Sequence, residues 1–268
     1  MINKKIVLNA RMSLHPKQGD SKNKKFWGMK MSANGNSEAD IFIYGDIERF
    51  EFDYSTITAS TFKEDLDALG DVKTINLYIN SLGGSVFEGL AIYNQLKRHK
   101  AYIRGYVDAV AASIASVILM AADEIHMPSN SNLMVHNPWL GVVGNAEALR
   151  KKADELDRIG QSAIQTYLDK AGDKLEETKL KELLDAESWL SAAEAQSYGL
   201  CDVILEANNM VASASKEMLA RYKNVPEELK QKSVAMNASE FQIRKQMTEQ
   251  AKQNVENLND ILGGIINV

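Results

Sequence analysis

The 268-residue sequence predicts an α/β fold, in which strands and helices alternate along the chain. Short apolar runs of strand length end at glycine or small-residue turns, as at 75–80, which the pair Gly83-Gly84 closely follows. Apolar residues at helical spacing come after such turns, as they do over 86–99. The repeated order of strand, turn and helix is typical of βαβ units.

The expected elements follow one another between residues 41 and 199. Strands are expected at 41–45, 75–80 and 101–107, with extended structure over 124–135 that breaks around 128–130. Helices are expected at 61–69, 86–99, 113–122 and about 146–170, the last as an extended arm that stops at Gly172. A capping box of Ser191 and Glu194 opens a short helix that Gly199 ends.

We expect one folded domain with two appendages. Residues 1–38 read as a polar, loop-like N-terminal leader, and 39–208 as the folded domain. Residues 209–268 form a polar C-terminal extension rich in Lys, Glu, Gln and Asn. An amphipathic helix is expected near its end, with apolar positions three or four residues apart at Met247, Ala251, Val255, Leu258, Leu262 and Ile265.

Composition excludes several classes of function. The net charge of −5 gives no electrostatic footprint for nucleic acid. The most apolar window, 107–122, is shorter than the roughly 20 residues that span a bilayer, and it contains Asp108. No secretion signal is visible, and the single Cys201 cannot form an intrachain disulfide, so we expect a cytoplasmic protein. No metal-ligand cluster or phosphate-binding loop appears, so neither a metal nor a cofactor is expected.

Ser113 is the candidate nucleophile. It lies between Ala and Ile residues at a junction of strand and helix, where a hydroxyl can be exposed while its neighbours are buried. The amide of Ile114, at the start of the helix, can donate to developing negative charge. Gly84 offers a second such amide, because a glycine pair allows close approach of a substrate. Together these two amides predict an oxyanion hole.

His136 is the candidate general base, because it follows Ser113 by 23 residues at the end of an apolar strand. The other histidines suit this role less well: His15 lies in the polar leader, His99 ends a surface helix, and His126 lies within extended structure. A third group, an acid that orients the imidazole, is expected from 185–189. This stretch offers both Asp185 and Glu187, and the residues alone leave the choice open.

Each of these motifs is, by itself, more typical of ordinary structure. An Ala-Ala-Ser-Ile-Ala stretch usually packs a helix, a Gly-Gly pair usually forms a turn, and a histidine after a strand is usually hydrogen-bonded in place. Ser116, one helical turn beyond Ser113, is expected to be packed. The prediction of an active site depends on the motifs occurring together in this order.

Four segments in order carry a resemblance to a known family: 78–84, 111–115, 133–138, and 189–195 leading to 198–202. Residues 40–206 resemble the ClpP family of serine peptidases, and particularly the ClpP-related proteases of phages and prophages that are often assigned to head maturation. The resemblance implies Ser113 as nucleophile, His136 as base, an acid near position 187, and the amides of Gly84 and Ile114 as oxyanion hole. Glu187 then becomes the preferred acid and Asp185 the reserve.

The resemblance also implies architecture and partners. It implies the ClpP/crotonase spiral of repeated ββα units, stacked homo-oligomeric rings, and a long protruding helix that joins the rings. The substrates would be proteins or peptides, and the partners an AAA+ unfoldase ring or phage capsid proteins, in the host cytoplasm or a phage prohead. Three positions depart from the family's usual residues: Leu82 replaces Pro, Ala115 replaces Gly, and Glu187 replaces Asp. None of the three removes a reacting atom.

The resulting hypothesis is a self-compartmentalising serine endopeptidase, ATP-independent or assisted by a partner. Two other classes stay open: a crotonase-like acyl-CoA enzyme, which shares the spiral and a paired-amide oxyanion hole, and a catalytically silent assembly or scaffold protein. The leader or the C-terminal extension would be free to direct the protease into an assembling shell, since both lie outside the core.

Overall fold

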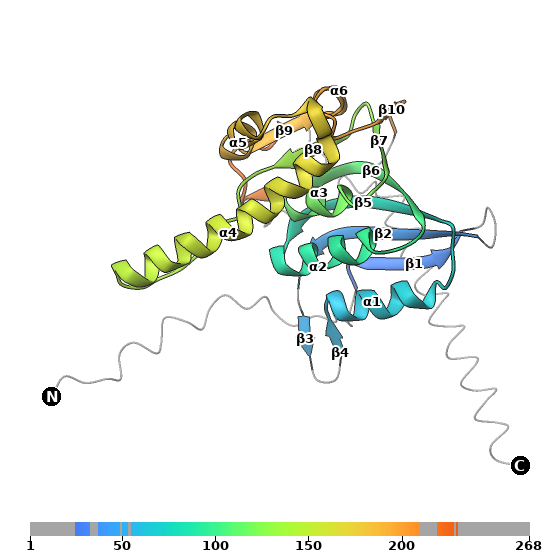
Figure 1. Cartoon of the computed structure of the whole chain (residues 1–268), viewed down its shortest axis with the longest axis horizontal. Helices are drawn as coiled ribbons and strands as arrows, with labels where there is room; N and C mark the ends of the chain where they lie inside the picture. Colours follow the sequence, from blue (N-terminus) through green and yellow to red (C-terminus); the bar gives the residue numbers. More distant parts are fainter. Residues whose placement is uncertain are drawn as a thin grey trace, which may run out of the picture.

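A computed structural model of the chain describes residues 25–32, 37–48, 50–52, 55–208, 219–227 and 229. Its main feature is an eight-stranded sheet in the order β1-β2-β5-β6-β7-β10, to which β8 attaches beside β6 and β9 beside β8 (Figure 1). The strands of this sheet are β1 (Trp27–Met31), β2 (Glu38–Ile47), β5 (Thr74–Gly84), β6 (Tyr102–Ala112), β7 (Glu124–Pro128), β8 (Asn132–Val135), β9 (Ser188–Ser191) and β10 (Val203–Leu205). A separate hairpin pairs β3 (Phe50–Phe52) with β4 (Ser55–Ile57).

Helices alternate with these strands, as the sequence predicts, so the α/β fold class is confirmed. The helices are α1 (Ala59–Ala68), α2 (Val86–Lys97), α3 (Ile114–Leu119), α4 (Ala146–Ala171), a short 3-10 turn η1 (Gly172–Lys174), α5 (Glu177–Asp185) and α6 (Ala192–Ser197). The capping box of Ser191 and Glu194 is present at the start of α6. None of the helices in the described part of the chain is long and apolar enough to cross a membrane.

The centre of the sheet is parallel and buried. β2, β5, β6, β7 and β10 pair in parallel, whereas β1 and β9 add antiparallel edges. Side chains that alternate along β2 and β6 point into the core on one face, as expected for parallel strands covered by helices. On the other face a half-buried row of stacked rings crosses the strands, formed by Phe42, Tyr78, Tyr106 and His126.

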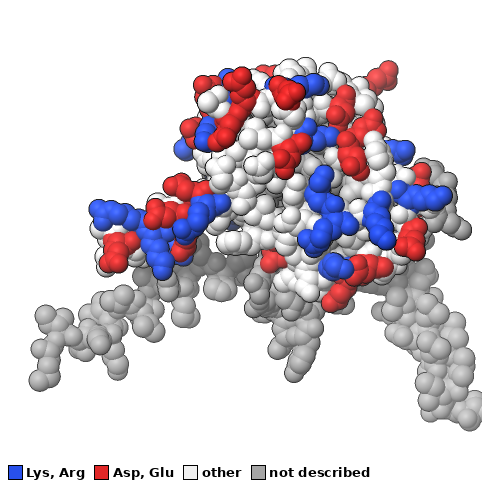
Figure 2. All heavy atoms as spheres, in the orientation of Figure 1, with Lys and Arg blue, Asp and Glu red and all other residues white. Residues whose placement is uncertain are grey.

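The long helix α4 projects from the body of the molecule, as predicted (Figure 1). Its first residues, 146–154, are all exposed, whereas Ile164 and Tyr167 farther along are buried against the core. Figure 2 shows basic and acidic side chains intermingled along this arm. Lys152 and Glu155 of α4 form an ion pair at 2.5 Å. The free end of α4 therefore has no apolar support from its own chain within the described residues.

Two stretches outside the expected domain core are structured. The expectation of a loop up to residue 38 is wrong for 27–31, which form the edge strand β1. Trp27 anchors this strand, because its ring lies 5.6 Å from that of Phe62 and its Nε1 donates to Asp65 at 2.7 Å. Residues 219–227 and 229 of the C-terminal extension also pack against the domain. The predicted tail helix over 247–265 lies outside the described residues, and the division into three parts stays a prediction.

A buried pair of hydroxyl groups ties α4 to α3. Ser116 Oγ lies 2.6 Å from the carbonyl oxygen of Ser113, 3.0 Å from that of Met134, and 2.6 Å from the Tyr167 hydroxyl. Because the single serine proton is used on a carbonyl oxygen, the phenol of Tyr167 must donate to Ser116 Oγ. Burial of Tyr167 raises its pKa, so this donor keeps its proton. Ser116 is thus packed, as predicted.

We expect Tyr167→Phe to destabilise the fold by about 1 kcal/mol, because it removes one buried hydrogen bond without creating a large cavity. The free energy of unfolding in urea measures this loss. Tyr102→Phe is the matched control, since Tyr102 is 46% exposed. Equal stability of the Tyr167→Phe variant and the wild type would contradict the assignment of the hydrogen bond.

Candidate active site

The pairing of β6 with its two neighbours fixes the position of Ser113. β6 runs parallel to β5, with Ala111 opposite Ser81, and parallel to β8, with Ala112 opposite Met134. Ser113 is the next residue after the paired end of β6, and its backbone N–H donates to the carbonyl of Met134 at 3.0 Å. The candidate nucleophile is therefore held at the carboxyl ends of three parallel strands, where ligand sites of such sheets usually lie.

The pairing of β8 with β9 brings the candidate base and the candidate acids to the same end of the sheet. His136 follows Val135, the last residue of β8. β9 is antiparallel to β8, and Val135 is opposite Ser188. Glu187, directly before Ser188, therefore lies beside His136 although 51 residues separate them in the sequence. The sequence gives no register, so the residues alone could not show this placement.

Ser113 occupies a strained turn. It is the N-cap of α3 with φ 55° and ψ −130°. Among the described residues, Ser113 and Glu187 (φ 48°) are the non-glycine residues with positive φ. Such conformations cost free energy and are concentrated at functional sites. A sharp turn from strand to helix also exposes a serine side chain in the way that a nucleophile elbow does.

Ser113 and His136 are in direct contact. Ser113 Oγ and His136 Nε2 are 2.7 Å apart, which is hydrogen-bond distance. His136 is 9% exposed, and this burial lowers the pKa of its imidazole, while the charge of Glu187 acts in the opposite direction. Since the net shift is downward, the imidazole is neutral at pH 7 and can accept a proton from the serine.

The two candidate acids have different surroundings. Glu187 acts electrostatically on His136, and its Oε2 accepts the backbone N–H of Lys223 at 3.0 Å. Asp185, the last residue of α5, instead accepts a hydrogen bond from the side-chain amide of Asn137 at 2.6 Å. The charge that reaches the imidazole is thus that of Glu187.

The glycine pair lies against Ser113 and leaves no room for side chains. A Cβ atom on Gly83 (φ 96°) would lie 2.7 Å from the Cβ of Ser113 and 3.2 Å from the amide nitrogen of Ile114. A Cβ on Gly84 (φ 150°) would lie 2.0 Å from the carbonyl oxygen of Ile47. Both positions therefore require glycine, and the backbone of Gly83 lies close to Ser113.

Two small recesses flank Ser113. One, of about 90 Å³, is lined by Gly84, Val86, Ser113, His136, Pro138, Trp139, Arg221 and Tyr222. The other, of about 20 Å³, extends between α3 and α4 and is lined by Val86, Ser113, Ile114, Val117, His136, Pro138, Ile159, Ala163 and Tyr167. Arg221 and Tyr222 were not foreseen, because the polar extension carries no motif that marks them.

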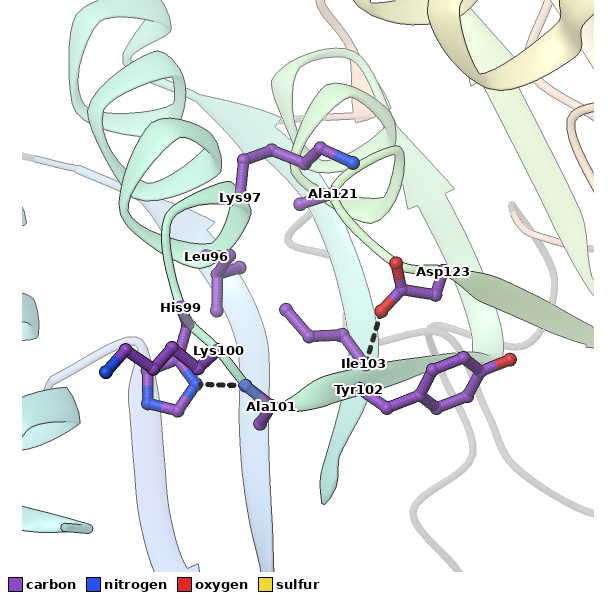
Figure 3. Close-up of a pocket in the computed structure, with 9 residues that line it drawn as sticks. All are labelled: Leu96, Lys97, His99, Lys100, Ala101, Tyr102, Ile103, Ala121 and Asp123. Atoms are coloured by element: carbon purple, nitrogen blue, oxygen red, sulfur yellow. Dashed lines mark hydrogen bonds between the residues drawn. The ribbon is translucent and has the colours of Figure 1, made fainter. Parts of the chain in front are cut away.

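A larger pocket, of about 320 Å³, lies at the opposite end of β6 (Figure 3). Two of its polar side chains are already engaged: Asp123 accepts the backbone N–H of Ile103 at 2.7 Å, and His99 Nδ1 accepts that of Ala101 at 3.1 Å. An eleven-residue strand separates this pocket from Ser113 by roughly 30 Å. His99 is therefore a structural histidine at the end of α2, as expected. His126 is also a structural histidine, because it lies 3.2 Å from Glu124 and stacks on Tyr106.

Comparison with known proteins shows the family of the chain. The family model described as Clp protease matches residues 29–208. The chain is 32% identical over 152 residues to the ATP-dependent Clp protease proteolytic subunit 1 of Salinibacter ruber, a match that covers 56% of this chain and 64% of that protein. It is 31% identical over 155 residues to the ATP-dependent Clp protease proteolytic subunit of Bacteroides fragilis, covering 57% of this chain and 74% of the relative. Because the family model spans more than half of the sequence, the chain belongs to the Clp protease family, whose members are serine peptidases.

Proposed function

We propose that this protein is a serine endopeptidase of the ClpP type, with Ser113 as nucleophile, His136 as general base and Glu187 as the acid of the triad. The contact of 2.7 Å between Ser113 Oγ and His136 Nε2 carries this proposal. A neutral buried imidazole in contact with a serine on a strained turn is the arrangement that activates a hydroxyl.

In the proposed reaction, Ser113 Oγ attacks the carbonyl carbon of a peptide bond while His136 Nε2 takes the hydroxyl proton. The carboxylate of Glu187 stabilises the imidazolium that forms. The amides of Gly84 and Ile114 donate to the oxyanion of the tetrahedral intermediate. Imidazolium then gives its proton to the departing amine as the C–N bond breaks, which leaves an ester on Ser113. Water, with His136 again as base, hydrolyses this ester.

Several observations support the choice of these groups. Glu187 is the carboxylate whose charge reaches His136, whereas Asp185 is bonded to Asn137. Gly84 lines the same recess as Ser113, and Ile114 begins α3, where its amide is in the first helical turn. A crotonase-like acyl-CoA enzyme would need no serine and histidine in contact, and a silent scaffold would gain nothing from the strain at Ser113.

The wider role that we propose follows from the family. The exposed start of α4 suits an arm that joins rings of this chain, which would enclose the active sites. In one route, an AAA+ unfoldase would deliver protein or peptide substrates, since the relatives are named as ATP-dependent subunits. In the other, the protein would be a phage or prophage head maturation protease that cleaves capsid proteins without an unfoldase. Stimulation of proteolysis by ATP and an unfoldase would favour the first route. Cleavage of capsid precursor without ATP would favour the second.

We expect an alkyl fluorophosphonate to label Ser113 of the purified full chain, as identified by mass spectrometry of its peptides. Ser113→Ala and His136→Ala should both abolish labelling, because one removes the nucleophile and the other its base. Ser162→Ala is the control, since Ser162 is exposed on α4, and should label like the wild type. A folded wild-type protein that takes no label would favour the scaffold or crotonase-like function instead.

Glu187→Gln should lower kcat/KM about 10²- to 10⁴-fold, because the charge that stabilises the imidazolium is lost. It should also move the acidic limb of the pH profile. The negative charge of Glu187 raises the pKa of His136, so its removal lowers that pKa further below 6.5, and the limb shifts to lower pH. Glutamine still offers an oxygen to the Lys223 amide, so the change tests charge alone. If Asp185→Asn rather than Glu187→Gln moves the limb, Asp185 is the acid.

A further inference from the structure

Residues 219–227 and 229, called here the covering segment, lie over the candidate active site. The hydroxyl of Tyr222 donates to the carbonyl oxygen of Leu82, directly before the glycine pair. The Tyr222 ring is edge-on to the imidazole of His136, with centroids 5.4 Å apart, and to Trp189 at 5.9 Å. The phenol also interacts with the hydroxyl of Ser113. One side chain of the segment therefore touches the nucleophile, the base and the glycine turn.

The same segment holds the candidate acid. The backbone N–H of Lys223 donates to Glu187 Oε2 at 3.0 Å, and the side-chain amide of Asn224 donates to the carbonyl of Ala186 at 2.9 Å. The Lys223 ammonium lies 4.0 Å from Glu187 Oε1, with its own side chain largely exposed. The segment is thus bonded on both sides of the cleft, to the end of β5 and to the residues directly before β9.

An apolar contact holds these bonds in place. Four side chains of the segment form a second core cluster with the ends of the strands that carry the site, namely Leu219, Tyr222, Val225 and Leu229 against Leu82, Val110, Ala112 and Met134. Tyr222 is only 9% exposed, and burial raises its pKa to about 12. The strand ends would otherwise form an apolar shelf beside Ser113, open to solvent or to a peptide.

The covering segment narrows the space around Ser113. The recess that Arg221 and Tyr222 help to line measures about 90 Å³, and the neighbouring one about 20 Å³. Sites for small molecules usually measure about 300–1,000 Å³. Displacement of the segment would therefore enlarge the space open to a substrate beside Ser113.

One buried hydrogen-bond donor beside the covering segment has no partner among the described residues. Trp189 Nε1, beside the Tyr222 ring, is buried with no hydrogen-bond partner among the described residues. A buried donor without a partner costs free energy. Arg221, Lys223 and Asn224 are exposed, so these three side chains add little buried contact to the four apolar ones. These features suit a contact that opens.

We propose that the covering segment is an internal ligand of the substrate cleft, which blocks Ser113 until it is displaced. The cleft would accept peptides that place an aromatic side chain against Leu82, Met134 and Trp189, as the segment places Tyr222. This inference rests on the proposed peptidase function. If the segment blocks the cleft, loosening it should raise the rate of reaction at Ser113. If Tyr222 instead positions His136 for catalysis, the same change should lower that rate.

The rate of fluorophosphonate labelling at Ser113 in the full chain tests this. Tyr222→Ala should label about tenfold faster than the wild type, the change expected when a contact worth about 1.4 kcal/mol is lost. Tyr222→Phe keeps the ring but loses the hydroxyl that bonds Leu82 and interacts with Ser113. Asn224→Ala loses the bond to Ala186. Each should give a smaller acceleration than Tyr222→Ala. Tyr102→Ala, at the far end of β6, is the matched control and should leave the rate unchanged.

The outcomes separate the two proposals. Equal or slower labelling in all three segment variants, with Ser113 still labelled, overturns the blocking role and leaves the peptidase function standing. Absence of label in every folded variant overturns the peptidase function and this inference with it. If Tyr222→Ala fails to fold, the comparison is made with Tyr222→Phe and Asn224→Ala, which keep the apolar contact.

A synthetic peptide of residues 219–229 tests the ligand role directly. Added to the Tyr222→Ala protein, it should slow labelling of Ser113 in proportion to its occupancy of the cleft. The same peptide with Ala in place of Tyr222 is its control and should have a weaker effect. Equal effects of the two peptides would overturn the assignment of an aromatic site.

Discussion

The register between β6 and β8 is the constraint on which the rest of the site depends. It sets Ala112 opposite Met134, so the chain leaves β6 at Ser113 just where the carbonyl of Met134 can accept its amide hydrogen. A shift of one residue would turn the side chains of the paired strand to the other face of the sheet. Ser113 and His136 meet because both follow the last paired residues of neighbouring parallel strands.

The strain at Ser113 persists because surrounding groups fix it. Its amide is bonded to β8, and its carbonyl receives the hydroxyl of Ser116, which Tyr167 of α4 supports from behind. The neighbouring glycine pair fills the remaining space without a Cβ atom. A backbone held from three sides keeps an unfavourable φ that an isolated turn would relax. The helix that projects as the arm is thus also the helix that supports the turn at Ser113.

The sequence predicted the α/β class, most helices and the ordered motifs, because these depend on local periodicity and turn chemistry. Ser113 and His136 could be singled out for the same reason, and the structure brings them into contact. Pairing across the sheet could not be predicted. β1 was missed because Trp27–Met31 is short and flanked by polar residues. The ring that anchors it, Phe62, lies on α1 and is distant in the sequence. The residues alone left Asp185 and Glu187 open, because the β8–β9 register that places Glu187 beside His136 has no local signal. Tyr222 carried no local signal, since its partners Leu82 and His136 are 140 and 86 residues away.

Access to the site and the basicity of His136 are physically linked. Burial is the main cause of the lowered pKa of this imidazole, and the Tyr222 ring is part of what buries it. Departure of the covering segment would let water approach the ring, which raises its pKa towards the ordinary value and strengthens it as a base. At the same time Glu187 would lose the Lys223 amide as a donor, which leaves more of the acceptor capacity of its carboxylate for the imidazole. The movement that admits a peptide would thereby also strengthen the proposed acid–base pair of Glu187 and His136.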